Sequence, residues 1–184
     1  MDNIHSTTSE ATAVWPRDQV IKEAKRIEEA ALLSSKGHFI AATRWSYFHL
    51  VVGVAISVLA AIAAASTFSS RWPEVVGWIA LLVTILSAIT TFVNPNERAT
   101  KHLNAGNGYD SVCNRARVFW TIDCWSDKAD GEALTEKLRR LSEEKSKLNL
   151  ESPQIAPWAY RTAKKGVAAG EGSYAVDQEQ KTQG

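Results

Sequence analysis

Residues 45–70 read WSYFHLVVGVAISVLAAIAAASTFSS and contain no Asp, Glu, Lys or Arg. After the short break RWPE at 71–74, residues 75–96 are again uncharged. At ~1.5 Å of rise per residue, helices over 45–68 and 75–93 would be roughly 36 Å and about 28 Å long. The hydrocarbon core of a bilayer is ~30 Å thick and needs about 20 helical residues. Each stretch therefore predicts a membrane-spanning helix.

The short connection predicts that the second helix returns antiparallel, so that residues 45–93 form a transmembrane helical hairpin. Basic residues lie on both sides of this hairpin, whereas the loop holds only one. The bias predicts a multi-pass protein whose N and C termini are cytoplasmic. Aromatic and basic residues near the ends of the spans are typical of the headgroup region. The candidate membrane-interface residues are Arg44, Trp45, His49, Arg71 and Trp72.

The alternative is a soluble, Ala-rich helical bundle with these two helices in its core. The mean hydropathy of −0.18 does not decide between the two, because polar flanks dilute the average. A helix of a soluble protein would normally present a charged face, and neither stretch carries one. We therefore expect an all-α membrane protein with cytosolic N- and C-terminal helices.

Before the hairpin, residues 1–15 are polar, and we expect them to be disordered. Residues 16–44 predict a cytosolic amphipathic helical lead, because Val20, Ala24 and Ile27 recur at helical spacing opposite charged residues. Gly37 has a low helix propensity, and a break is expected there.

After the hairpin, residues 94–150 predict cytosolic helices that begin with Asn94 as the cap, Pro95 at the first position and Glu97 reaching back. Two glycines within residues 104–108 predict that the helix is weakened there. Four leucines, at 134, 138, 141 and 148, predict a helix that docks on the preceding one or forms a coiled coil between subunits. Residues 151–184 predict a Pro-containing link, one short helix from Pro157 and a disordered tail from Gly166.

Small and hydroxylated residues share a face on each predicted span. Such a face packs on another helix, with its hydroxyls bonded to the preceding turn. Alternatively, it lines a polar conduit, which would require several copies because one hairpin cannot enclose a pore. Both interpretations stay open. The candidate pore-lining or helix-packing residues are Gly53 and Ser57 in the first span and Gly77, Thr84, Ser87 and Thr91 in the second.

Motifs for catalysis are absent from the sequence. The four histidines are scattered, and none belongs to an HExxH motif or to a Cys/His pair with metal-ligand spacing. Cys113 and Cys124 are expected to be reduced, packed thiols. We expect neither an enzyme nor a cofactor or metal site. A net charge of +1 gives no global basic field, so direct nucleic-acid binding is not expected.

Six features follow one another in this order: the lead at 21–33, the hairpin at 45–93, FVNPNERA at 92–99, KHLNAGNGY at 101–109, the Leu-rich helix at 134–148 and PWAYRTAK at 157–164. Over residues 17–168 this layout resembles the SLATT domains, two-transmembrane effector modules of bacterial nucleotide-sensing and anti-phage conflict systems.

The resemblance implies an effector that oligomerises in the bacterial inner membrane and permeabilises it once a separately encoded sensor protein or nucleotide signal activates it. Its partners would be the lipid bilayer, further copies of itself and that sensor. The other expectation is a non-conducting membrane anchor or scaffold, which recruits a cytosolic partner through residues 134–148.

Overall fold

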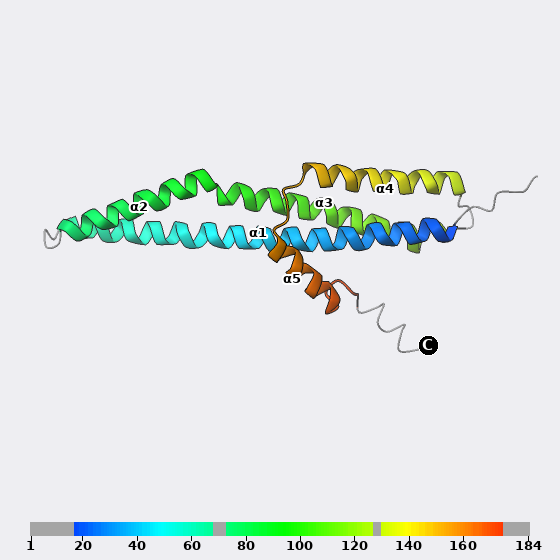
Figure 1. Ribbon diagram of the computed structural model, residues 1–184, viewed down its shortest axis with the longest axis horizontal. Helices are drawn as coiled ribbons and strands as arrows, with labels where there is room; N and C mark the ends of the chain where they lie inside the picture. Colours follow the sequence, from blue (N-terminus) through cyan, green and yellow to red (C-terminus); the bar gives the residue numbers. More distant parts are fainter. Residues whose placement is uncertain (1–16, 68–72, 127–129, 175–184) are drawn as a thin grey trace, which may run out of the picture.

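The computed structural model describes residues 17–67, 73–126 and 130–174. Apart from an isolated bridge between Glu171 and Ser173, regular structure in these ranges is helical, as predicted. Predictions made for residues 1–15, Arg71, Trp72 and 175–184 fall outside the described ranges. The elements are α1 (Arg17–Thr67), α2 (Pro73–Val93), α3 (Pro95–Thr121), the 3-10 turn η1 (Asp123–Trp125), α4 (Gly131–Glu151) and α5 (Pro157–Ala168) (Figure 1).

The first helix, α1, has 51 residues and passes from the polar end of the molecule into the apolar end without interruption (Figure 1). The predicted break at Gly37 is therefore wrong. Gly37 is buried, and a Cβ added to it would lie 3.2 Å from the side chain of Ile155. The glycine makes room for the link between α4 and α5. Packing against this link offsets the low helix propensity of glycine.

A single residue, Asn94, separates α2 from α3. Its φ of 44° lies in the left-handed region, which Asn adopts more readily than most residues. Its N–H donates to the carbonyl of Thr90 (3.0 Å), and its side chain accepts from the N–H of Glu97 (3.4 Å). The predicted cap, with Pro95 at the first position of α3, is confirmed. The Glu97 carboxylate, however, accepts from the Asn94 side-chain amide (2.6 Å) and not from its backbone.

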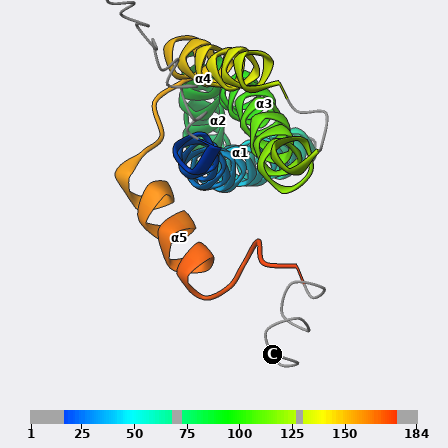
Figure 2. The same ribbon diagram turned by 90° about the vertical axis from the view of Figure 1, so that its right-hand side faces the viewer.

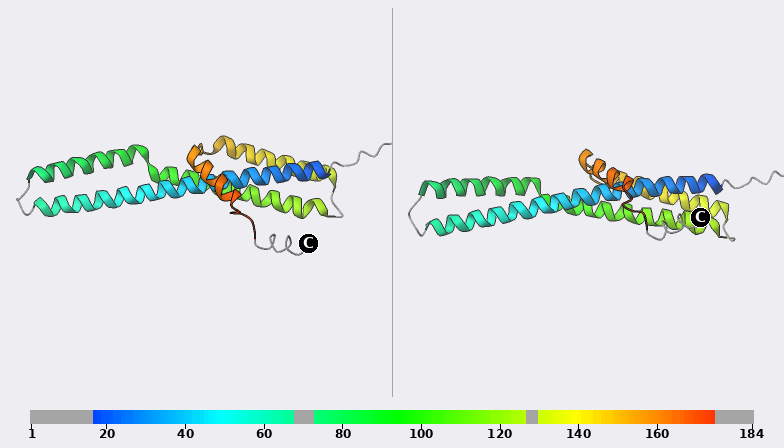
Figure 3. Two further views of the ribbon diagram at one scale, coloured as in Figure 1. Left: turned by 60° about the horizontal axis from the view of Figure 1, so that its bottom comes forward. Right: turned by 90° about the horizontal axis from the view of Figure 1, so that it is seen from below.

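At the apolar end, α2 lies alongside the second half of α1 and runs in the opposite direction (Figures 1 and 3). The two helices meet in a narrow seam, which we call the α1–α2 seam. Its half-buried residues recur at alternating steps of three and four, the spacing of two helices that cross at a shallow angle. The seam comprises Val52, Ile56, Leu59 and Ala63 of α1 and Val76, Ile79, Val83, Leu86 and Thr90 of α2.

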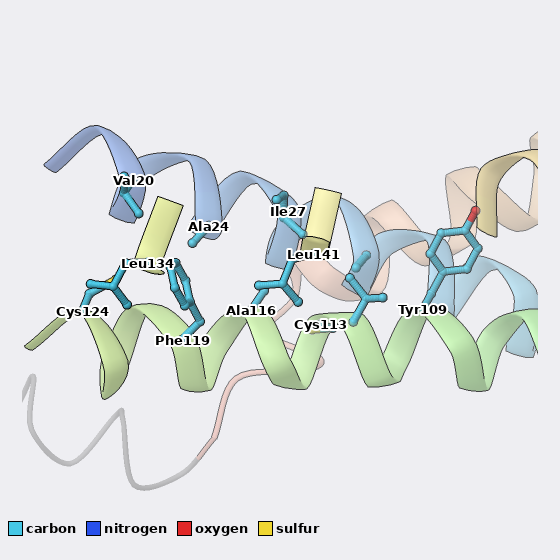
Figure 4. Packing of buried hydrophobic residues seen from close by; sticks show 12 residues of the cluster. Val20, Ala24, Ile27, Tyr109, Cys113, Ala116, Phe119, Cys124, Leu134 and Leu141 are labelled. Atoms are coloured by element: carbon cyan, nitrogen blue, oxygen red, sulfur yellow. The ribbon is translucent and has the colours of Figure 1, made fainter. Parts of the chain in front are cut away.

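At the polar end, α1, α3 and α4 pack around a common core (Figures 2 and 4). The predicted amphipathic face of residues 16–44 supplies one side of it. Leu134 and Leu141 are buried in the same core, so α4 docks on the preceding helices of its own chain, the first of the two predicted arrangements. The buried residues are Val20, Ala24, Ile27 and Ala31 of α1, Tyr109, Val112, Cys113, Ala116 and Phe119 of α3, Cys124 of η1, and Leu134 and Leu141 of α4.

Residues 104–108 lie inside the continuous helix α3, so the predicted weakening of the helix there is wrong. A Cβ added to Gly106 would lie 2.7 Å from the ring of Phe39, and one added to Gly108 would lie 2.7 Å from the side chain of Leu148. The two glycines therefore let α1 and α4 approach α3 closely. They are packing positions, and the contacts that they allow stabilise the helix around them.

The last helix, α5, begins at Pro157 as predicted and leaves the bundle at an angle (Figure 2). Its Ala159 and Ala163 are buried, and its main neighbour is α1. The predicted disorder is wrong for residues 166–174, because α5 runs past Gly166 and the chain then folds back. The N–H of Glu171 donates to the carbonyl of Gly166 (2.9 Å), and its carboxylate pairs with Lys36 of α1 (3.1 Å).

Candidate functional site at the junction of the apolar and polar halves

The apolar ends of α1 and α2 present their side chains outward. Within the described residues, these two helices are long and apolar enough to cross a membrane, and none of their most apolar stretch is buried. Trp78 is 71% exposed and Phe92 is 88% exposed. Core helices of a soluble bundle are mostly buried, so this exposure argues against the soluble alternative.

The small-residue faces are not used for packing within the chain. Apart from the chain neighbours and the backbone of its own helix, no atom lies within 4 Å of a Cβ added to Gly53 or to Gly77. Thr84 and Thr91 are exposed as well, and Ser87 is half-buried beside the α1–α2 seam. The expectation that these faces pack on another helix is therefore not met by α1 against α2. They remain available to a second molecule or to lipid.

Hydroxyl groups on the two apolar helices bond to their own helix. Ser57 Oγ donates to the carbonyl of Gly53 (2.9 Å), Thr84 Oγ1 donates to Ala80 (2.8 Å) and Thr91 Oγ1 donates to Ser87 (2.9 Å). Such bonds satisfy a hydroxyl in an apolar environment. The oxygen of each group keeps a free acceptor position toward the outside.

The predicted interface residues that the structure describes lie where the apolar half begins. Arg44 and His49 are exposed, and Trp45 is half-buried with its ring edge-on to Phe48 at a centroid distance of 6.1 Å. Sequence reasoning missed their partners from other elements. The guanidinium of Arg44 lies over the indole of Trp158 in α5 at 4.6 Å, and that of Arg98 in α3 lies over Trp45 at 5.3 Å.

These groups surround a cavity of about 600 Å³ between α1, α3 and α5, which we call the junction pocket. Arg98 also donates through Nε to the carbonyl of Val93 at the end of α2 (2.8 Å). The pocket therefore joins the last turn of α2, the start of α3 and the link before α5. The residues that define it here are Arg44, Trp45, Phe48, Arg98, Gln154 and Trp158.

On the polar side of the junction pocket, two histidines form a buried pair. His38 Nδ1 lies 2.9 Å from His102 Nδ1, and the His38 ring stacks on Tyr109 at 5.4 Å. Burial, and secondarily the nearby His102, lower the pKa of His38 to about 4. Burial and then Arg98 also lower the pKa of His102. Both rings are therefore neutral at pH 7, and one donates to the other.

Neither cysteine is set up as a nucleophile. Both are buried free thiols in the polar core, and burial raises the pKa of Cys113 to about 11. A thiolate is the reactive form, so this thiol is inert at neutral pH. Among residues 17–67, 73–126 and 130–174, no three His, Cys, Asp or Glu side chains are grouped to hold a metal ion.

Comparison of the chain with models of known protein families, with curated proteins and with solved structures gives no match.

Proposed function

We propose that this protein is a membrane effector of a bacterial anti-phage or nucleotide-sensing conflict system, as its resemblance to the SLATT domains implies. It would oligomerise in the inner membrane and permeabilise it when a partner sensor activates it. One observation carries the membrane part of the proposal: no residue in the most apolar stretch of α1 or α2 is buried, and outside the α1–α2 seam apolar side chains from Leu50 to Ile62 and from Val75 to Phe92 are exposed. A helix of 21 residues is ~31 Å long, which matches the hydrocarbon core.

The orientation in the membrane is part of the same proposal. Arg44 and Arg98 line one pocket, so both polar flanks leave the apolar half at the same end. With basic residues concentrated at that end, the positive-inside rule favours cytoplasmic N and C termini. A tag fused to either terminus should then be accessible from the cytoplasmic side only.

Oligomerisation is supported by the unpacked small-residue faces. Gly53 and Gly77 have open space above them, and a second copy could approach closely there. The hydroxyls of Thr84 and Thr91 lie on the same exposed side of α2. In an assembly of several copies, their free acceptor positions would face an enclosed conduit.

The second candidate is a non-conducting anchor that recruits a cytosolic partner. The back-bonding of Ser57, Thr84 and Thr91 favours it, because a hydroxyl satisfied by its own helix needs no water. Recruitment through Leu134 and Leu141 is contradicted, since both are buried in the chain's own core. Only the charged outer face of α4 would be available to a partner.

The test compares dye leakage from liposomes that contain the purified full chain or the variant Thr84→Leu/Ser87→Leu. The proposal predicts that the variant still inserts but no longer causes leakage or toxicity. The matched control is Ile85→Leu/Ile89→Leu, which changes two exposed apolar residues of the same helix and should leak like the wild type. Unchanged leakage in the Thr84/Ser87 variant would remove the conduit assignment. Absence of leakage from the activated wild type, with partner recruitment intact, would favour the anchor.

A further inference from the structure

We propose that the junction pocket binds the phosphate of an anionic phospholipid headgroup, held between Arg44 and Arg98. This inference rests on the proposed membrane insertion, because the lipid would reach the pocket from the surrounding leaflet. It adds a ligand and a binding site that oligomerisation and permeabilisation do not require.

The charges at the pocket favour an anion. Arg44 and Arg98 come from different helices, and both residues line the same cavity of about 600 Å³. Among the described residues, no carboxylate forms an ion pair with either group. The carboxylate nearest in sequence, that of Glu97, pairs with Lys101 (2.6 Å) and accepts from Asn94, and the charge of Arg98 acts on it only as a smaller influence. Two cations that share a cavity and form no ion pair there attract an anion.

The surroundings of the two arginines fit a phosphate. The Arg44 guanidinium lies over the indole of Trp158 at 4.6 Å, and that of Arg98 lies over the indole of Trp45 at 5.3 Å. A cation–π contact restrains a guanidinium without using its N–H groups as hydrogen-bond donors. The planar guanidinium presents parallel N–H donors that match the oxygens of a phosphate. A phosphate can accept two hydrogen bonds from one guanidinium. The Nε bond from Arg98 to Val93 uses one donor only, so the terminal nitrogens of Arg98 stay available.

The position of the pocket favours a lipid over a soluble phosphate. The pocket lies where the uncharged parts of α1 and α2 begin, and Trp45 and Phe48 form its wall toward the apolar half. A phosphodiester there would be at headgroup level. Its acyl chains would run along the exposed apolar side chains of α1 and α2, including Leu50 and Val54. Anionic lipids are attracted to basic residues beside a membrane span.

The experiment measures the thermal unfolding of the full chain in detergent while phosphatidylglycerol is added. Phosphatidylglycerol should raise the Tm of the wild type in a saturable way. Phosphatidylcholine and soluble glycerol phosphate, added at the same concentration, should change it little. In Arg44→Gln/Arg98→Gln, the apparent affinity for phosphatidylglycerol should fall by about tenfold or more, because charge-assisted hydrogen bonds are lost.

Two further variants keep the result interpretable. Arg139→Gln/Arg140→Gln removes the same charge from the exposed face of α4 and should respond to phosphatidylglycerol like the wild type. Arg44→Lys/Arg98→Lys keeps the positive charge but lacks the paired N–H donors of a guanidinium, and it should bind phosphatidylglycerol with intermediate affinity. The Tm of each variant without lipid reports whether it has folded.

Equal responses of the wild type and the Arg44/Arg98 glutamine variant would overturn the site. An equal effect of soluble glycerol phosphate would overturn the lipid as the source of the phosphate, and an equal effect of phosphatidylcholine would overturn the requirement for an anionic headgroup. Extraction of each variant from cell membranes, measured separately, reports on insertion. Failure of lipid binding is thereby distinguished from failure of the proposed function.

Discussion

The Nδ1 atoms of His38 and His102 lie 2.9 Å apart in the interior between α1 and α3, although the two residues are 64 positions apart in the sequence. At this distance one ring donates and the other accepts, so at least one of the two must stay neutral. The pair lies on the polar side of the junction pocket, and His102 is one of the residues that line this pocket.

Acid should destabilise the polar half through this pair. The unfolded chain titrates His38 near 6.5, whereas the pKa in the folded chain is about 4, so only the unfolded state takes up a proton between these values. Stability is therefore complete above about pH 6.5 and falls as the pH drops toward 4, by on the order of 3 kcal/mol from His38. His102, whose pKa is also lowered, acts in the same direction. Thermal unfolding measured from about pH 7.5 to about pH 4.5 checks this.

The control for the pH effect is His38→Gln/His102→Gln. Glutamine can keep a hydrogen bond between the two positions but has no proton to gain in this range. Its Tm should depend less on pH than that of the wild type. If both proteins lose stability equally between neutral and acidic pH, the histidine pair is not the cause.

Gly106→Ala should lower the stability of the α1–α3 contact. The added Cβ would lie 2.7 Å from the ring of Phe39, and overpacking of this kind costs about 1–3 kcal/mol. The gain in helix propensity, about 1 kcal/mol, offsets part of that cost. The measurement is the Tm of the purified variant. Asn107→Ala is the control, because this neighbouring residue of α3 is exposed, and its Tm should not fall.

Leu141→Ala should destabilise the protein by about 2–4 kcal/mol, because this side chain is 5% exposed in the core shared by α1, α3 and α4. Glu144→Gln, one turn further along α4, removes the carboxylate that pairs with Arg115. This pair is half exposed, and its loss should cost less than about 1 kcal/mol. Chemical denaturation of the two variants should therefore give clearly different midpoints. Equal midpoints would contradict the assignment of α4 to the chain's own core.

Asn94→Ala should weaken the junction between α2 and α3 in two ways. It removes the side-chain acceptor for the Glu97 N–H, at about 0.5–2 kcal/mol, and it places alanine in a left-handed conformation. Asn94→Gly removes the same side chain without the backbone strain. The expected order of Tm is wild type, then glycine, then alanine. An alanine variant as stable as the glycine variant would show that the backbone at this position relaxes.

The sequence predicted those features that depend on neighbours along the chain. The uncharged stretches, the cap at Asn94, the Leu134–Leu141 spacing and the start of α5 at Pro157 are local patterns, and the structure contains all of them. Gly37, Gly106 and Gly108 were misinterpreted as weak points. Their role depends on Ile155, Phe39 and Leu148, side chains that are distant in the sequence.

The candidate site was predicted less completely than the fold. Arg44 and Trp45 could be placed at the end of a span from their position before an uncharged run. Their contacts with Trp158 and Arg98 could not be predicted. These contacts arise from the angle at which α5 crosses α1 and from the turn at Asn94. The His38–His102 pair is likewise set by the register of α3 against α1. No local signal in the sequence marks it.

The central claim is that lipid surrounds the uncharged halves of α1 and α2. Its most direct test is alkaline carbonate extraction of membranes from cells that express the full chain. The account predicts that the protein stays in the membrane pellet and enters the supernatant only with detergent. Recovery of folded protein in the supernatant without detergent would contradict it.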